Sequence, residues 1–110
     1  MKRRHNDNPE ARVEKLLCDL VQEHGGLAFK WVSPDNPGVP DRIVITPEGR
    51  TIFVELKTEI GRLANIQKWQ HSRLLEHGVE VRTLKGMGEV RAFIKEVFGC
   101  IETTTKRPAS

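Results

Sequence analysis

Two segments of the chain carry apolar residues at the spacing of one face of an α-helix. In the first segment these residues are Val13, Leu16, Leu17, Leu20 and Val21. In the second segment they are Val90, Phe93, Ile94 and Val97. We expect the first helix to begin after Asn8, which can cap it, with Pro9 in the first helical position, and to end at Gly25-Gly26. The last helix is expected to open at Gly86-Met87-Gly88.

Between these helices the sequence has the short apolar and alternating runs that are typical of β-strands. They cover residues 27–32, 41–46, 51–58 and 79–84. Three prolines in residues 33–40 predict a stiff loop, and Pro47-Glu48-Gly49 predicts a three-residue hairpin loop. A helix with a weaker apolar pattern is expected at about residues 64–77, ended by Gly78. The order α-β-β-β-α-β-α predicts an α/β fold with a mixed four-stranded sheet flanked by helices.

Length, charge and cysteine content set further bounds. The 110 residues suffice for one domain. We expect it at residues 8–99, between a basic arm at residues 1–7 and a flexible tail at residues 100–110. The net charge of +3 permits a nucleic-acid partner without requiring one. No apolar run is long enough to span a membrane, and Cys18 and Cys100 are too few for a disulfide framework, so an intracellular location is expected.

The strand at residues 51–58 carries two charged side chains on one face. Because side chains alternate along a strand, Glu55 and Lys57 point away from its apolar face. If Thr46 pairs with Arg50 across the hairpin loop, Asp41 faces Glu55 with the Cβ atoms roughly 5 Å apart. One of two carboxylates so close would hold a proton unless a cation lay between them. Mg²⁺ or Mn²⁺ suits such oxygen ligands, and Lys57 could orient a water or neutralise charge on a phosphate.

Purely structural roles remain open for the same residues. Asp41 follows Pro40 and could be a turn residue, and Glu55 with Lys57 could form a solvated ion pair on a sheet that is covered on one side only. The Pro-Asp start, the apolar strands around the pair and the hairpin register favour the metal site.

Three sequence blocks, in order, resemble a known nuclease family. Pro40-Asp41, followed after thirteen residues by Glu55-Leu56-Lys57, matches the PD-(D/E)xK motif of the restriction-endonuclease-like superfamily. The residues around this motif are similar to the virus-type replication-repair nuclease (VRR-NUC) family. The three blocks are Gly38-Val39-Pro40-Asp41, Phe53-Val54-Glu55-Leu56-Lys57-Thr58 and Gly61-Arg62-Leu63 followed by Gln67. The resemblance runs from about Glu14 to the strand at residues 79–84 and implies a restriction-endonuclease-like core.

The resemblance implies a role for each matching position. The metal ligands would be Glu14, Asp41, Glu55 and the backbone carbonyl of Leu56. Lys57 would be the catalytic lysine, and Gln67 would support the site or contact the scissile phosphate. The family often has a Ser-Pro pair before this glutamine, where this sequence has Ala64-Asn65-Ile66. By their spacing alone, Glu14 and Gln67 could also be ordinary surface residues. The basic residues that could touch phosphates, or could simply be solvated, are Lys30, Arg62, Lys68 and Arg73.

The resemblance also implies an activity, an Mg²⁺- or Mn²⁺-dependent DNA endonuclease. Stand-alone viral members of the family are understood as homodimers that act on branched DNA of the four-way (Holliday) junction type, which would place such a chain in the host cytoplasm. A chain of this length has no room for a separate target-reading domain. Two other classes stay open: a module that binds DNA structures without cutting, and a nuclease subunit directed by a partner in a replication or packaging complex.

Overall fold

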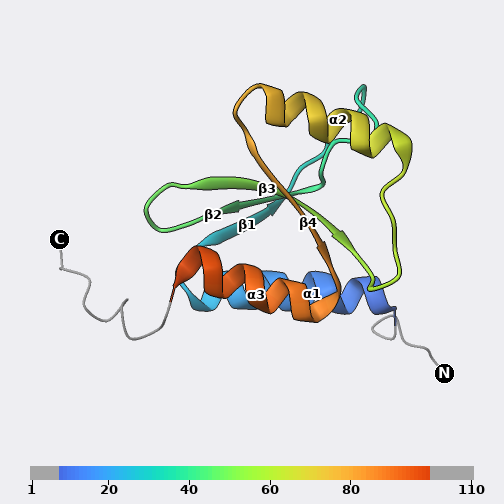
Figure 1. The fold of residues 1–110 in the computed structure, drawn as a ribbon. Helices are drawn as coiled ribbons and strands as arrows, with labels where there is room; N and C mark the ends of the chain where they lie inside the picture. Colours follow the sequence, from blue (N-terminus) through green and yellow to red (C-terminus); the bar gives the residue numbers. More distant parts are fainter. Residues whose placement is uncertain (1–7, 100–110) are drawn as a thin grey trace.

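The computed structural model describes residues 8–99, which form a four-stranded sheet with helices on both faces (Figure 1). The elements are α1 (Pro9–Glu23), β1 (Leu27–Lys30), β2 (Arg42–Ile45), β3 (Thr51–Lys57), α2 (Asn65–Glu76), β4 (Glu80–Lys85) and α3 (Gly86–Phe98). This order confirms the α/β fold expected from the sequence. The predicted basic arm and tail, and Cys100 with them, lie outside the described residues, and none of the described helices is long and apolar enough to cross a membrane.

The sheet has the strand order β1-β2-β3-β4 and is mixed, as predicted. β1 pairs antiparallel with β2, and β2 with β3, whereas β3 and β4 are parallel. Parallel neighbours need a crossover connection, and α2 supplies it on the face opposite α1 and α3 (Figure 1).

Several predicted element ends were wrong by one or two residues. β1 stops at Lys30, not at residue 32, because the chain enters the proline-rich loop, although the amide of Trp31 still donates to the carbonyl of Asp41 at 2.8 Å. β2 lacks the first and last of its predicted residues, whereas β3 begins at Thr51 as predicted and lacks only residue 58. α2 is one residue shorter at each end than predicted, and β4 lies one residue later.

One face of the sheet forms the hydrophobic core with α1 and α3. Asn8 caps α1, because its side chain accepts a hydrogen bond from the amide of Glu10 at 2.9 Å. The helix stops where Gly25 adopts a φ of 82°. The buried core residues are Val13, Leu17, Val21, Val44, Ile52, Val54, Leu56, Leu84, Val90, Phe93 and Ile94. The predicted apolar stripes of both helices thus supply one side of the core.

The β2–β3 hairpin sets the register on which the candidate site depends. The amide of Thr46 donates to the carbonyl of Arg50 at 2.9 Å, and Gly49 takes the predicted left-handed conformation with a φ of 93°. Ile43 therefore pairs with Phe53, as expected. A one-residue change in this loop would move every side chain of β2 to the opposite face.

The proline-rich loop that leads to Asp41 is held in place by α2. Gly38 packs so closely on α2 that a Cβ atom there would lie 2.6 Å from the carbonyl oxygen of Ile66. In addition, the side-chain amide of Gln70 donates to the carbonyl of Pro37 at 3.2 Å. The position of Asp41 thus depends on contacts with a helix that follows it by more than twenty residues.

Replacing Gly38 by alanine tests this anchoring. Gly38 and Gly78 both have a positive φ, 96° and 81°, but nothing lies within 4 Å of a Cβ at Gly78. We expect Gly78→Ala to cost about 1 kcal/mol of unfolding free energy from backbone strain alone. Gly38→Ala should cost at least about 1 kcal/mol more, because the loop must move away from α2. Equal losses of unfolding free energy in the two variants, measured by denaturant unfolding, would contradict this anchoring of the loop by α2.

Candidate active site

The three charged residues of the PD…ExK motif come together at one end of β2 and β3. Glu55 and Lys57 lie on β3 and point away from its apolar face, as predicted. The face to which they point is the one covered by α2, and Asp41 immediately precedes β2. The pairing of Arg42 with Val54 puts Asp41 in the next row of the ladder, beside Glu55. Glu55 is 6% exposed, and the Lys57 ammonium lies 3.8 Å from its Oε2 atom.

Glu55 is held in surroundings that oppose its negative charge. Burial, followed by the nearby carboxylate of Asp41, raises the pKa of Glu55 from 4.5 to about 7. Lys57 and a hydrogen bond from Gln67 lower this pKa in part, but they do not offset burial and repulsion. The Asp41–Glu55 pair therefore gains from any further cation placed between the two carboxylates.

Gln67 connects α2 to the carboxylate pair. Its Nε2 atom donates to Oε2 of Glu55 at 3.1 Å, and its Oε1 atom accepts from the backbone amide of Ala64 at 2.8 Å. Ala64 cannot cap the helix with its own side chain, so Gln67 satisfies an amide at the start of α2 while it holds Glu55. The contacts of Gln67 and Lys57 both involve the Oε2 atom of Glu55.

Glu14 lies close to the site but is turned toward another partner. It forms a partly buried ion pair with Arg42, which points to the core face of β2. Among residues 8–99, no three carboxylate, imidazole or thiol side chains are close enough to surround a metal ion. Glu14, Asp41 and Leu56 nevertheless line the same polar pocket of about 210 Å³ beside the first turn of α1.

The chemistry of these donors fits a divalent cation of the Mg²⁺ type. Such ions take oxygen ligands and keep several waters, so two adjacent carboxylates and a pocket open to solvent suit them. Asp41 and Glu55 supply the paired oxygens, and Glu14 and Leu56 line the same pocket as Asp41. The ligand set that the sequence implies remains a prediction. Glu14 would have to move away from Arg42 before it could bind a metal ion.

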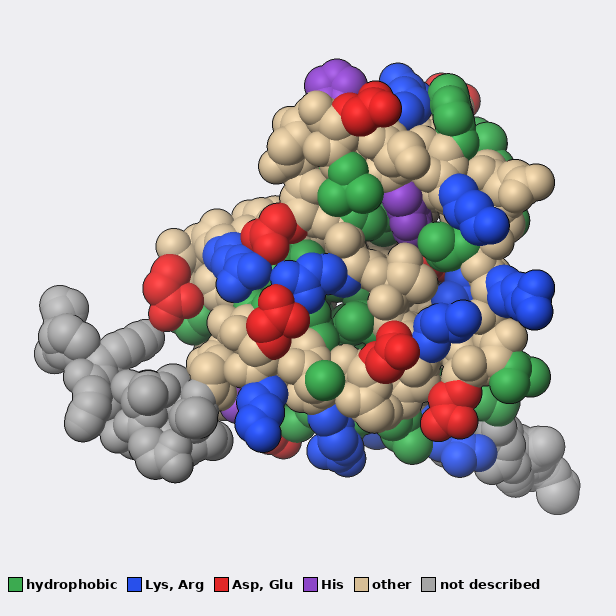
Figure 2. Space-filling model, in the orientation of Figure 1, with side chains coloured by type: hydrophobic (Ala, Val, Ile, Leu, Met, Phe, Trp, Pro, Cys, Tyr) green, Lys and Arg blue, Asp and Glu red, His purple; other side chains and the backbone are tan. Residues whose placement is uncertain are grey.

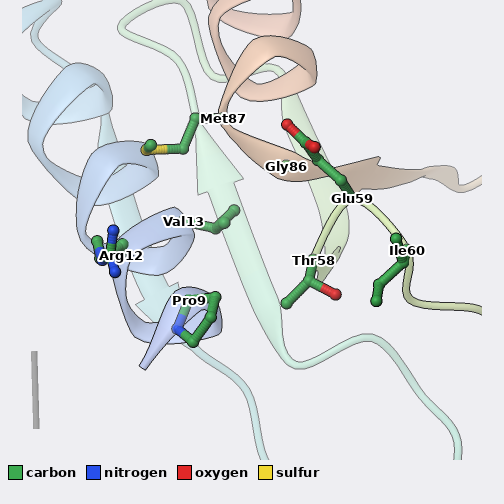
Figure 3. Close-up of a pocket in the computed structure, with 8 residues that line it drawn as sticks. All are labelled: Pro9, Arg12, Val13, Thr58, Glu59, Ile60, Gly86 and Met87. Atoms are coloured by element: carbon green, nitrogen blue, oxygen red, sulfur yellow. The ribbon is translucent and has the colours of Figure 1, made fainter. Parts of the chain in front are cut away.

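A larger cavity of about 480 Å³ lies on the other side of the first turn of α1, and its lining is mainly apolar. Figure 3 shows Pro9 and Val13 of α1 and Met87 of α3 on one side of this space, with Thr58 and Ile60 of the β3–α2 connection on the other. None of the motif side chains lines it. It therefore lacks the paired carboxylates that make the smaller pocket suitable for a metal.

Comparisons with known proteins show to which family this fold and sequence belong. No profile of a known protein family matches the chain. The protein named "Putative nuclease p44", from Acyrthosiphon pisum secondary endosymbiont phage 1, is 43% identical over 75 residues, which cover 68% of this chain and 81% of the phage protein. A solved structure described as a VRR_NUC domain is 30% identical, with a TM-score of 0.76 over 81% of this chain and 97% of that one. The chain belongs to the VRR-NUC family.

The VRR-NUC fold of this chain also places near the site two residues that were not predicted from the sequence. Arg42 is one, and the signal for it was a charged residue at a core-facing position of β2, two residues before buried Val44. His71 on α2 is another: it is 6% exposed, and its Nε2 atom is buried without a hydrogen-bond partner. Burial, and then Lys57, lower the pKa of His71, which keeps this imidazole neutral beside the lysine.

The four basic residues singled out from the VRR-NUC sequence separate into different places. Lys30 lines the polar pocket with Asp41. Arg73 lies over the ring of Trp69, 4.8 Å from its centroid, and donates to Gln70. Arg62 and Lys68 line a further pocket on the other side of Lys57 with residues of β4. The structure thus does not gather all four into one surface.

The raised pKa of Glu55 predicts an unusual dependence of stability on pH. The unfolded chain ionises this carboxyl near pH 4.5, whereas the folded protein keeps its proton up to about pH 7. Ionised Glu55 therefore destabilises the fold increasingly as the pH rises between these values. Without divalent metal, we expect Glu55→Gln to raise the unfolding free energy by about 1 to 3 kcal/mol at pH 8 and to change it little at pH 4.

Glu80→Gln provides a control of opposite sign. Arg50, through a hydrogen bond, lowers the pKa of Glu80, so the ionised form of this carboxylate stabilises the fold. Its substitution should lower the unfolding free energy slightly at pH 8. If Glu55→Gln were also destabilising at pH 8 in EDTA, burial of the Glu55 charge and its repulsion by Asp41 would not be the effects that dominate at this position.

Proposed function

We propose that this VRR-NUC protein is a metal-dependent endonuclease that hydrolyses DNA phosphodiesters at Asp41, Glu55 and Lys57. The observation that carries this proposal is the buried carboxylate beside a second carboxylate and an ammonium group, with the pKa of Glu55 raised to about 7. The likeness to a phage protein with a nuclease name and to a VRR_NUC domain supports the same activity.

Asp41 and Oε1 of Glu55 would hold Mg²⁺ or Mn²⁺, together with the carbonyl of Leu56 and with Glu14. When bound, such an ion supplies Lewis-acid polarisation of the phosphate and makes a water more acidic. Gln67 keeps Glu55 in place, because its amide is itself fixed by the backbone of Ala64. Two hydrogen bonds thus orient the carboxylate before any ion or substrate arrives.

Lys57 is the group best placed to act on the substrate. Its side chain is 21% exposed, so it is mostly buried and yet still reached by solvent. There it would donate hydrogen bonds to the attacking water and to a phosphate oxygen, and so stabilise the negative charge that develops during attack. Burial, and then the charge of Lys57, lower the pKa of His71, so this buried imidazole adds no competing positive charge near neutral pH.

The finer part of the proposal concerns the assembly and the substrate. We infer a homodimer, inside the host cell, that acts on branched DNA such as a four-way junction. A two-fold dimer presents two active sites at a fixed spacing, which suits a two-fold symmetric junction. Two apolar side chains of β1 are exposed, Leu27 at 50% and Phe29 at 51%, and they support an interface between copies.

Cleavage assays with a lysine variant test the activity. We expect the protein to cut a synthetic four-way junction with Mg²⁺ or Mn²⁺, in preference to linear duplex, flap or single strand, and to be inactive in EDTA. Lys57→Met should lower the cleavage rate by about 10²- to 10³-fold, because it removes a group that stabilises developing charge. DNA binding and folding should persist in this variant.

Lys95→Met, in the last turn of α3 away from the motif, is the matched control and should cleave at the wild-type rate. Full activity of Lys57→Met would contradict the assigned role of the lysine. Cleavage of flaps or linear DNA alone would support the assigned active site but contradict the four-way junction as the substrate. A monomer in gel filtration would favour a nuclease subunit directed by a partner, and no cleavage by folded protein would favour a DNA-binding module.

A further inference from the structure

A second pocket lies next to the carboxylate pair, over β4. In the parallel β3–β4 register, Thr83 is opposite Glu55 and Lys85 is opposite Lys57. Residues opposite each other in a sheet point to the same face, and neighbouring strands are about 4.8 Å apart. Thr83 and Lys85 therefore extend the row of active-site side chains from β3 onto β4.

Two further basic residues close this pocket from the other elements. Arg62 comes from the connection after β3, and Lys68 from the first turns of α2. Together with Thr83, Lys85 and the side chain of Leu63, they enclose about 470 Å³, and none of these five lining residues carries a carboxylate. Figure 2 shows Lys and Arg side chains gathered on the side of the molecule where this connection enters α2, below the helix.

The basic residues of this pocket differ from those on the core side of the sheet in whether they form ion pairs. Within residues 8–99, Arg62, Lys68 and Lys85 make no ion pair with a carboxylate. Arg50 and Arg82 are each bound to acidic partners on the core side of the sheet. Three basic side chains that form no ion pair with a carboxylate line this one pocket and repel each other, which favours binding of an anion there.

We propose that Arg62, Lys68, Thr83 and Lys85 form a second phosphate-binding site, which takes the DNA phosphate next to the one that is cut. This inference rests on the proposed nuclease function for its ligand. The three basic residues would balance the phosphate charge, and the hydroxyl of Thr83 would donate to one phosphate oxygen. Contacts of this kind position a strand without reading its sequence. The site thus directs the strand across β3 and β4, so that one phosphate lies at Asp41 and Glu55.

Binding measurements in EDTA test this site without any need for cleavage. Labelled four-way junction and linear duplex would be titrated with Lys68→Gln, Lys85→Gln and Thr83→Val over a series of salt concentrations. Each lysine variant should lower the slope of log Kd against log salt by about one, since one phosphate contact is lost. Lys95→Gln, on α3, is the matched control and should leave this slope unchanged.

The Thr83→Val variant distinguishes a specific phosphate-binding site from non-specific attraction of DNA to a positively charged surface. It removes a hydroxyl, keeps the shape and changes no charge, so non-specific attraction would not respond to it. A hydrogen bond to the phosphate predicts about tenfold weaker binding with an unchanged salt slope. Wild-type affinity of Thr83→Val, or slopes of Lys68→Gln and Lys85→Gln equal to that of Lys95→Gln, would overturn the proposal. Failure of the wild type to cut DNA with Mg²⁺ would contradict the nuclease function. The binding assays in EDTA would still decide whether these residues bind a DNA phosphate.

Discussion

The burial of Glu55 beside the carboxylate of Asp41 is the constraint around which the polar face of this protein is arranged. Holding two carboxylates side by side, one of them 6% exposed, costs free energy that the rest of the fold must offset. The hairpin register brings the two together, and the contacts of Gly38 and Gln70 with α2 keep the loop before Asp41 in place. Lys57 and Gln67 relieve part of the cost, and a bound cation would relieve the remainder.

The sheet therefore has two faces with different tasks. The face under α1 and α3 is filled with aliphatic side chains and Phe93, and it supplies most of the stability. The face under α2 buries Gln70, His71 and Glu55 instead. A helix that covers a functional polar surface has little reason to carry an apolar stripe. A buried helix face made of polar residues contributes less to stability than an apolar one, but it can hold charged groups in fixed positions.

The same division explains what the sequence could and could not predict. The hairpin, the apolar face of β3 and the row containing Asp41 and Glu55 follow from local rules of turn length and side-chain alternation, and the structure confirms them. The contact between Glu14 and Arg42 depends on how α1 is rotated against the sheet, which no local pattern specifies. The inner face of α2, with Gln70 and His71, was missed for a related reason: buried polar residues look like surface residues in a sequence.

The central claim is that the carboxylate pair is a divalent-metal site, and Mn²⁺ binding measured by isothermal titration calorimetry without DNA tests it most directly. At pH 8, where Glu55 is ionised, wild-type protein should bind Mn²⁺, and Asp41→Asn should weaken this binding by about 10- to 100-fold or more. Because Asp41→Asn also removes the repulsion on Glu55, the variant should remain folded. Equal Mn²⁺ affinity in the wild type and in folded Asp41→Asn would contradict the account.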